Sequence, residues 1–200
     1  MPSVRLLAFS DLHRDSAQAQ KLAERSQQAD IVIGAGDFAS VRLGIDDAIE
    51  PLKQIDKPTV LVPGNNESKS ELAEACDGWA SATLLHGGSV DIDGVTFFGL
   101  GGGVPVTPFQ WSFDLSESEA DEKLAGCPEG CVLVVHSPPK GYVDEAHGRH
   151  MGSDAILAAI KAKRPRLVVC GHIHDSWGQE ATIGRTPVVN LGPEGRFFEV

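Results

Sequence analysis

The chain has 200 residues, of which 42% are hydrophobic and 22% are charged, and these proportions are typical of a globular protein. One domain spanning residues 1–200 is expected, because a chain of this length can bury about 70% of its unfolded surface. The formal net charge of −11 argues against long DNA or RNA as the main partner, since a phosphate backbone needs a basic surface. A single phosphate group remains possible, because bound divalent cations can reverse the potential of an acidic cleft.

The sequence shows no signal for export or membrane insertion. No signal-peptide region precedes the first apolar segment, and no apolar run is long enough to span a bilayer. The cysteines have no paired Cys-x-x-Cys spacing and are expected to be reduced, with a disulfide between Cys127 and Cys131 as the alternative. These features predict a cytoplasmic protein without a membrane partner.

The first third of the chain alternates segments of strand and helix character. Short apolar runs at 4–9, 31–33 and 59–62 predict buried strands, and the segments 16–28 and 44–54 between them predict helices. Ser68 and Glu71 have the spacing of a capping box that opens another helix. This alternation indicates parallel strands with helices on the faces of the sheet.

The rest of the chain mixes hairpins with further strands and helices. Asp93-Gly94 predicts a tight hairpin turn that leads into a strand at 95–100, and a Gly- and Pro-rich loop follows. Ser116 and Glu119 form a second capping box, and strands at 131–135 and 167–170 flank a helix at 154–163. The segments 179–183, 187–190 and 196–200 have an antiparallel pattern. We therefore expect a mixed α/β fold with two sheets.

Chemically active side chains follow five of the predicted strands, at the point where each strand ends. In open α/β sheets, ligands bind outside the carboxyl ends of the strands. A single Asp or His there is commonly an ordinary hydrogen-bonded residue, but no fold requires such residues at all five ends. In chain order they are Asp11, His13, Asp37, Asn65, His136, His172 and His174.

These seven side chains offer imidazole nitrogen and oxygen but no thiolate. Such a set suits Mn, Fe, Co, Ni or Zn better than Mg or Ca, which prefer oxygen alone. One ion holds about four to six ligands, so two divalent metal ions are predicted. Asp37 stands alone at its strand end and is the expected bridging carboxylate. Asp11 and His13, two residues apart, can reach one ion together.

The ordered motifs resemble those of the calcineurin-like metallophosphoesterases, over nearly the whole chain from residue 4 to about 192. The matching motifs are Asp11-x-His13, Gly36-Asp37, Gly64-Asn65-Asn66-Glu67, His136 and Gly171-His172-x-His174. The stretches 136–141, 152–153, 171–174 and 190–192 are similar to the small Icc-related branch. The resemblance implies a four-layer α-β-β-α sandwich of two mixed β-sheets flanked by helices. It also implies one metal held by Asp11, His13, Asp37 and His174, and a second held by Asp37, Asn65, His136 and His172.

One position departs from the family pattern. The family usually has a His where this chain has Asn66, and that His is thought to protonate the leaving group or steady the transition state. An amide can donate a hydrogen bond to a phosphoryl oxygen but cannot act as a general acid near neutral pH. We therefore expect slow turnover that favours activated phosphodiesters, or another acid. His147 and His150 are the candidates for that acid, and the alternative is that both are solvated loop residues.

The resemblance implies a metal-dependent phosphoesterase acting on phosphodiesters of small molecules or nucleotides, with a hydroxide activated by two metals as the nucleophile. Asn66 and the metal charge would stabilise the developing negative charge. Glu67 and Asp175 are candidate acceptors for the second N–H of a His ligand. Phe109 or Trp111 can stack a nucleobase or, alternatively, cover the core.

Two other functions compete with this interpretation. The first is a non-catalytic metal-binding or protein-interaction scaffold of the same fold, which the absence of His at position 66 suggests. The presence of all seven ligand-type side chains argues against it. The second is a metal-dependent nuclease, against which the net charge of −11 counts. A small phosphoester substrate is thus the expected partner, and the sequence does not predict an oligomeric state.

Overall fold

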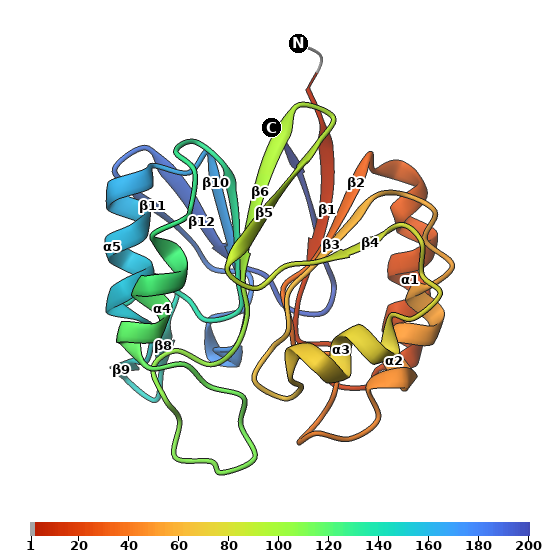
Figure 1. Ribbon diagram of the computed structural model, residues 1–200, viewed down its shortest axis with the longest axis horizontal. Coiled ribbons are helices and arrows are strands. Elements are labelled where there is room, and N and C mark those ends of the chain that lie inside the picture. The colour runs from red at the N-terminus through yellow and green to blue at the C-terminus, as the bar shows by residue number, and fades with distance from the viewer. Residues whose placement is uncertain (1–2) are drawn as a thin grey trace.

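Two β-sheets pack face to face at the centre of the molecule, and helices cover the outer face of each sheet (Figure 1). The structure is a computed structural model that describes residues 3–200. Helices from the first half of the chain cover one sheet, and helices from the second half cover the other. The layers run helix, sheet, sheet, helix, which confirms the four-layer α-β-β-α sandwich that the family resemblance implies.

The first sheet is mostly parallel. Its spatial order is β13 (Arg196–Glu199), β1 (Arg5–Phe9), β2 (Ile31–Gly34), β3 (Thr59–Leu61) and β4 (Ala82–Leu84). The strands from β1 to β4 run parallel, and β13 lies antiparallel at the edge beside β1. The helices between these strands, which pack on the outer side of the sheet, are α1 (Ser16–Arg25), α2 (Ile45–Leu52) and α3 (Lys69–Ala75).

The second sheet has parallel strands at its centre and antiparallel strands at its edges. Its spatial order is β11 (Glu180–Ile183), β12 (Thr186–Asn190), β10 (Leu167–Cys170), β7 (Val132–Val135), β6 (Val95–Leu100) and β5 (Gly88–Ile92). Its outer face is covered by α4 (Glu117–Leu124) and α5 (Asp154–Lys163). A two-stranded ribbon of β8 (Glu145–Ala146) and β9 (Arg149–His150) stands apart from both sheets, as do the 3₁₀ turns η1 (Ser26–Gln28) and η2 (His174–Ser176). No helix among residues 3–200 is both long and apolar enough to cross a membrane.

Alternate residues of each central strand face opposite apolar layers. In β1, Leu6 and Ala8 belong to the layer between the sheets, whereas Leu7 and Phe9 pack on the helix side. Because both faces are buried, these strands are apolar throughout, which is why continuous apolar runs mark them in the sequence.

The cysteines are free thiols that pack within these apolar layers. Cys127 and Cys131 are buried, and their Sγ atoms are 3.5 Å apart.

The local signals for turns and helix starts are confirmed. Asp93 and Gly94, with φ of 51° and 79°, form the turn between β5 and β6. Ser68 and Ser116 cap α3 and α4, and each exchanges hydrogen bonds with the Glu three residues later. These contacts are local, so neighbouring residues in the sequence suffice to predict them.

Some elements differ from the sequence prediction. The strand β4 and the ribbon β8–β9 are too short and too exposed to leave a readable pattern. Residues 26–28 form η1 instead of continuing α1. The C-terminal segments pair antiparallel as expected, β11 with β12 and β13 with β1, but β12 also runs parallel to β10.

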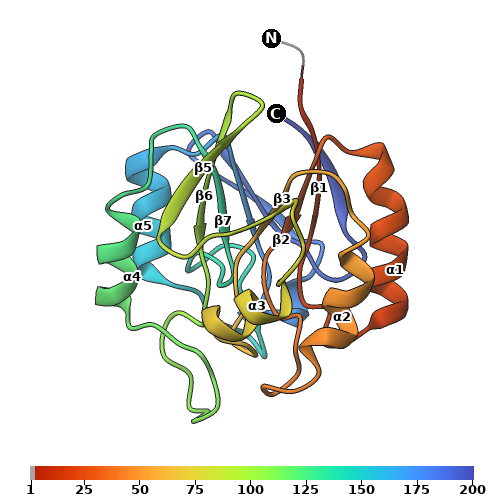
Figure 2. The same ribbon diagram turned by 45° about the vertical axis from the view of Figure 1, so that its right-hand side comes forward.

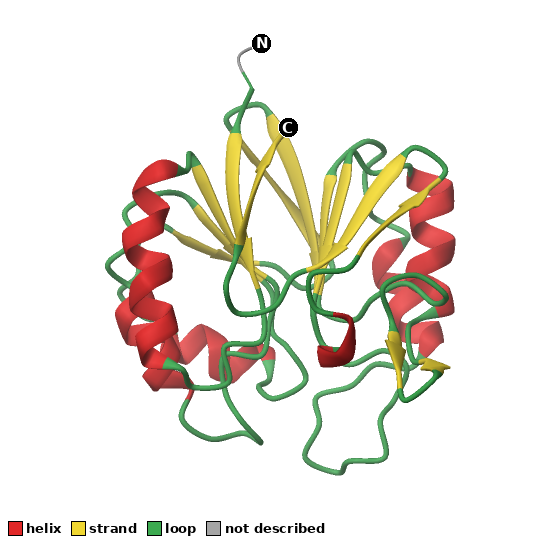
Figure 3. Cartoon of the chain, turned by 180° about the vertical axis from the view of Figure 1, so that it is seen from behind, coloured by secondary structure: helices red, strands yellow, loops and turns green. Residues whose placement is uncertain are grey.

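The parallel strands of both sheets end on the same side of the molecule, at the bottom of Figures 1 and 2. The loops that follow β1, β2, β3, β6, β7 and β10 therefore converge there. Seen from behind in Figure 3, the ribbon β8–β9 and the turn η2 lie beside these loops. A direct contact joins the two sheets at this edge, because Nδ1 of His136, after β7, lies 2.8 Å from the carbonyl oxygen of Ala35, after β2.

Candidate metal centre

The loop after β1 presents the buried carboxylate of Asp11. Its Oδ2 accepts hydrogen bonds from the Ser10 hydroxyl and, at 3.2 Å, from Nε1 of Trp177. Its Oδ1 lies 4.0 Å from Nε2 of His13 and 3.7 Å from Nε2 of His174. The backbone N–H of His172 also donates to this carboxylate, at 3.0 Å from Oδ1 and 3.2 Å from Oδ2. Oδ1 is thus the oxygen that faces the two imidazole nitrogens, and the backbone after β10 helps to hold it there. Ser10 and Trp177 are supporting residues that no sequence motif indicated.

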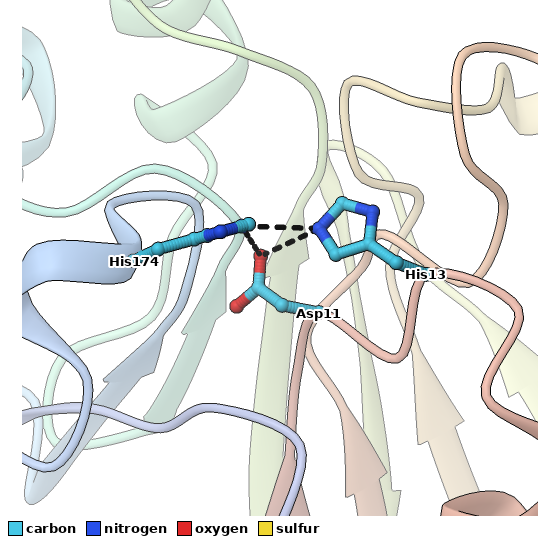
Figure 4. Close-up of side chains that lie close together, drawn as sticks. All are labelled: Asp11, His13 and His174. Carbon is cyan, nitrogen blue, oxygen red and sulfur yellow. Dashed lines mark hydrogen bonds and ion pairs between the residues drawn. The ribbon is translucent and has the colours of Figure 1, made fainter.

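Asp11, His13 and His174 form the first cluster, and Figure 4 shows their side chains converging from both halves of the molecule. One potential ligand atom from each lies within 4.8 Å of the others. The two Nε2 atoms are 3.0 Å apart. Two imidazole nitrogens at that distance can share one proton or coordinate one cation between them. The donor set of the first cluster therefore fits a divalent metal ion.

Asp37, His136 and His172 form the second cluster, and Asn65 joins it. Nε2 of His136 lies 3.4 Å from Oδ1 of Asp37 and 3.2 Å from Oδ1 of Asn65. The same Asn65 oxygen lies 2.9 Å from Nδ1 of His172. Asp37, Asn65 and His136 are buried, so these polar atoms meet with little access to water. The second cluster also offers the mixed nitrogen and oxygen donors that transition metals and zinc prefer.

Asp37 stands between the two clusters. Its Oδ1 faces His136 in the second cluster, and its Oδ2 lies 3.6 Å from Nε2 of His13 in the first. Each carboxylate oxygen therefore faces a different cluster. This geometry is what a carboxylate that bridges two cations requires.

Four of the predicted ligands have a left-handed backbone conformation. The φ angles of Asp11, His13, Asp37 and His172 are 56°, 44°, 59° and 70°. Residues with a Cβ adopt this region rarely and at a cost, so the surrounding structure must enforce it. Such residues concentrate at functional sites, where a sharp turn directs a side chain into the site.

Backbone carbonyls orient the His rings. Nδ1 of His136 is 2.8 Å from the oxygen of Ala35, and Nδ1 of His13 is 3.2 Å from the oxygen of Ala39. An N–H on each Nδ1 leaves the lone pair of Nε2 directed to the clusters. Glu67 and Asp175 are the candidate acceptors that the sequence offers for a His ligand. The rings of His136 and His13 contact backbone carbonyl oxygens instead.

Burial and neighbouring charges shift pKa values in opposite directions within the second cluster. Burial opposes the charged form of His136, but Asp37 outweighs it and raises the pKa of His136 to about 9. Burial likewise opposes the charged form of Asp37, but His136 outweighs it, and the pKa of Asp37 is lowered. Burial, with His136 nearby, lowers the pKa of His172 to about 4. A cation that binds here therefore meets a neutral His172 and displaces a proton from His136.

Glu67 is a buried carboxylate that holds the loop carrying Asp37. Its Oε1 accepts the backbone N–H groups of Asp37 at 2.9 Å and Gly64 at 2.6 Å, and its Oε2 accepts that of Ala39 at 3.0 Å. Burial, and then the charge of Asp37, raises the pKa of Glu67 to about 7. Glu67 thus positions the backbone of the two loops that follow β2 and β3.

We expect Glu67→Gln to lower the free energy of unfolding of the metal-free protein by about 2 kcal/mol, because an amide leaves at least one buried N–H without an acceptor. The pKa of Glu67 is higher in the folded protein, about 7 against an ordinary 4.5, so its stabilising contribution is lost as pH rises through this range. The loss should therefore be larger at pH 5 than at pH 8 in urea denaturation. Glu74→Gln on the exposed face of α3 is the control, and an equal loss at both pH values would contradict this account.

Gly64 allows the β3 loop to approach Asp37 closely. A Cβ at Gly64 would lie 2.0 Å from Oδ1 and 2.2 Å from the backbone N of Asp37. We expect Gly64→Ala to displace the carboxylate and weaken Mn²⁺ binding at least about tenfold, as measured by titration calorimetry. Gly88→Ala is the matched control, because its Cβ would meet no atom within 4 Å. Equal Mn²⁺ affinities for the two variants would show that this close approach is unimportant.

Asn66 lies buried beside Asp37. Its Nδ2 donates to Oδ2 of Asp37 at 2.7 Å, and its backbone N–H donates to Oδ1 at 2.9 Å. Its own Oδ1 accepts the backbone N–H of Val41 at 2.7 Å. Asn66 therefore contacts both oxygens of the carboxylate between the clusters.

His150 lies on the ribbon β8–β9, at the rim of this edge. Its Nδ1 is 2.7 Å from the buried carboxylate of Asp144, and its side chain is 54% exposed. The ribbon packs beside η2, where the Ser176 hydroxyl donates to the backbone of β8. His147 is almost fully exposed near Asp175. Among the contacts described for residues 3–200, none joins His147 or His150 to either cluster.

Ser112 and Asp114 support Asn65, a role that the sequence did not indicate. Nδ2 of Asn65 donates to the Ser112 hydroxyl at 3.0 Å, and that hydroxyl donates to Oδ1 of Asp114 at 2.6 Å. This chain of hydrogen bonds fixes the amide so that its oxygen faces the His rings of the second cluster. The loop that holds both residues has no periodic pattern, so only the folded contact identifies them.

Two animal proteins are similar to this chain in sequence. UPF0046 protein T07D4.2 of Caenorhabditis elegans is 30% identical over 172 residues, which cover 80% of this chain and 41% of the worm protein. Human metallophosphoesterase domain-containing protein 1 is 31% identical over 137 residues, which cover 65% of this chain and 39% of the human protein. The chain thus spans about two fifths of the length of these two relatives.

Solved structures with the same fold cover nearly the whole chain. TT1561 of Thermus thermophilus has a TM-score of 0.77 at 18% identity, over 96% of this chain and 91% of its own. A dimetal phosphatase from Danio rerio has a TM-score of 0.67 at 13% identity, over 96% of this chain and 88% of its own. Residues 4–198 match the family described as the calcineurin-like phosphoesterase superfamily domain. From that match, the shared architecture and the metal-ligand motifs at the strand ends, we conclude that the chain belongs to the calcineurin-like phosphoesterase superfamily.

Proposed function

We propose that this protein is a metal-dependent phosphodiesterase that uses two divalent cations to hydrolyse small phosphodiesters, nucleotides among the possible ones. The observation that supports it most is the position of Asp37, whose two oxygens face two separate groups of ligand-type side chains. Membership of a phosphoesterase superfamily supports hydrolysis at phosphorus. A scaffold would have no physical need for a buried carboxylate in this position.

Two sets of residues would hold the cations. Asp11, His13, Asp37 and His174 would hold the first, and Asp37, Asn65, His136 and His172 the second. The mixed nitrogen and oxygen donors suit Mn, Fe, Co, Ni or Zn. When bound, two such cations supply positive charge for the phosphoryl oxygens and make a nearby water acidic enough to attack near neutral pH.

The chain's own residues then orient the substrate and handle protons. Asn66, beside Asp37, donates an amide hydrogen to a phosphoryl oxygen and so stabilises the charge that develops there. It has no acidic proton for the leaving group. His150 is the proposed substitute, because Asp144 binds its Nδ1 and leaves Nε2 to hold or release a proton. Turnover is therefore expected to be fastest for leaving groups that depart without protonation.

The test is metal removal followed by restoration. Protein stripped with a chelator should not hydrolyse bis(p-nitrophenyl) phosphate, and activity should return as about two equivalents of Mn²⁺ are bound. Elemental analysis of the untreated protein identifies the metal that it carries from the cell. Tight binding of two cations without hydrolysis of any diester or monoester tested would favour the scaffold and contradict the proposal.

A further inference from the structure

The loop between β6 and α4 contains a cavity that borders the second cluster. Its volume is about 370 Å³, which is in the range of small-ligand pockets. The residues that line it are Val106, Thr107, Pro108, Phe109, Gln110, Ser112 and Asp114. Ser112 lines the cavity and also accepts the hydrogen bond from Nδ2 of Asn65. The cavity therefore begins one side chain away from a proposed metal ligand.

The one carboxylate that lines this cavity, that of Asp114, accepts hydrogen bonds from neutral neighbours. Oδ2 of Asp114 accepts the backbone N–H and the hydroxyl of Thr107, both at 2.7 Å, and Oδ1 accepts the Ser112 hydroxyl. No Lys or Arg is among the residues that line the cavity. A second phosphate group placed here would meet a carboxylate and no cation, which disfavours polyphosphates and nucleotides with several phosphates.

The apolar wall of the cavity is exposed. Val106 is 62% exposed and Phe109 is 53% exposed. The Phe109 ring stacks on Trp111, with the centroids 5.4 Å apart and the planes 17° from parallel. The stacked rings leave apolar surface open to solvent, and contiguous exposed apolar surface is typical of binding sites.

Exposed apolar side chains are found in several loops of the molecule. Within residues 3–200, the large hydrophobic side chains that are exposed are Val41, Leu43, Val106, Phe109, Met151 and Trp177. All of them lie in loops: Val41 and Leu43 follow β2, Val106 and Phe109 follow β6, Met151 follows β9 and Trp177 follows η2. Several loops that follow strands of the two sheets therefore carry exposed apolar side chains, on a protein of net charge −11.

We propose that the cavity binds the uncharged, apolar ester group of a phosphodiester whose phosphoryl group lies at the two clusters. This inference rests on the proposed function and narrows its substrate class. It predicts a preference for diesters with an alkyl or aryl second ester over diesters with a nucleoside. Phe109 and Val106 are the residues that determine the preference, since they contribute the exposed apolar wall.

The kinetic test keeps the leaving group constant. A series of p-nitrophenyl phosphodiesters would carry methyl, butyl or thymidine-5′-yl as the second ester group. Each fully buried methylene is worth about fourfold, and partial burial of three should raise kcat/KM about tenfold from methyl to butyl. The thymidine ester should be no better than the methyl ester. Equal values for methyl and butyl, or a clear preference for thymidine, would overturn the inference.

Variants of Phe109 test whether the preference for the butyl ester over the methyl ester arises in the cavity. Phe109→Ala should reduce the butyl-to-methyl ratio of kcat/KM from about tenfold to about threefold or less. Phe109→Leu, which keeps an apolar side chain, should retain most of the ratio. Leu43→Ala is the matched control, because Leu43 is equally exposed but does not line the cavity. An unchanged ratio in Phe109→Ala would overturn the inference.

A binding measurement separates this inference from the proposed function. Dibutyl phosphate should change the Trp fluorescence of the Zn²⁺-saturated protein in a saturable way, and Trp111→Phe should abolish the change. Dimethyl phosphate should bind at least about tenfold more weakly. If no diester is hydrolysed with any of the divalent metals tested but the fluorescence change appears, the proposed function fails and the cavity assignment stands. If hydrolysis occurs without a butyl preference and without the signal, the cavity assignment fails alone.

Discussion

Asp37→Asn is expected to lower the metal-dependent hydrolysis of bis(p-nitrophenyl) phosphate about 10³-fold. Asp37 is the side chain whose two oxygens face both clusters, and an amide offers only one oxygen. Its NH₂ group would also face the backbone N–H or the amide of Asn66, which both donate to Asp37. Changes that only disturb the support of a metal ligand cost about 10–100-fold, so loss of the proposed bridging carboxylate should cost more.

Asp175→Asn is the control for this effect. Asp175 is an exposed carboxylate at the same rim, next in sequence to His174, but it is in neither cluster. The control should keep full activity and bind two equivalents of metal, whereas Asp37→Asn should bind fewer. Retention of more than about a tenth of the activity in Asp37→Asn would mean that the carboxylate does not hold the reacting centre together.

Asn66→His should accelerate hydrolysis of methyl phenyl phosphate about 10²-fold. Phenolate needs protonation as it leaves, and a positioned general acid typically contributes about 10²–10⁴-fold. The imidazole would arise beside Asp37, where the Asn66 amide now lies 2.7 Å from Oδ2. Methyl p-nitrophenyl phosphate should change by less than about threefold, because p-nitrophenolate departs without a proton.

The variant Asn66→Ala separates proton donation from hydrogen bonding. It removes the amide that would contact a phosphoryl oxygen, so both esters should slow by a similar factor. His150→Gln should slow only the phenyl ester if His150 supplies the missing proton. If Asn66→His fails to accelerate the phenyl ester, the explanation offered here for the unusual residue at position 66 is wrong.

The part of the fold that could be predicted is the part governed by local or repetitive patterns. Strands such as β1 and β7 are buried on both faces and appear as apolar runs, and the Asp93-Gly94 turn and the Ser caps depend on adjacent residues. The pairing of β13 with β1 depends on a crossing from one sheet to the other, which no local pattern records. The ribbon β8–β9 is too short to show a period.

The candidate site likewise has a part that the sequence predicts and a part that it does not. Its seven ligand-type residues could be predicted, since parallel strands align their carboxyl ends and so bring distant motifs to one edge. The supporting contacts could not be predicted, because they join loops that are remote in sequence. Trp177 reaches Asp11 and Asp114 supports Asn65 through Ser112 in this way. The sequence predicts Glu67 as a candidate acceptor for a His ligand, whereas in the folded chain it accepts three backbone N–H groups instead.

The most direct test of the central claim is a crystal structure of the protein grown with Mn²⁺, with the ions located by anomalous scattering. The account predicts two peaks about 3.5–4 Å apart, with Asp37 between them. Asp11, His13 and His174 should surround one peak, and Asn65, His136 and His172 the other. A single peak, ions bound elsewhere, or these side chains turned away from the ions would contradict the account.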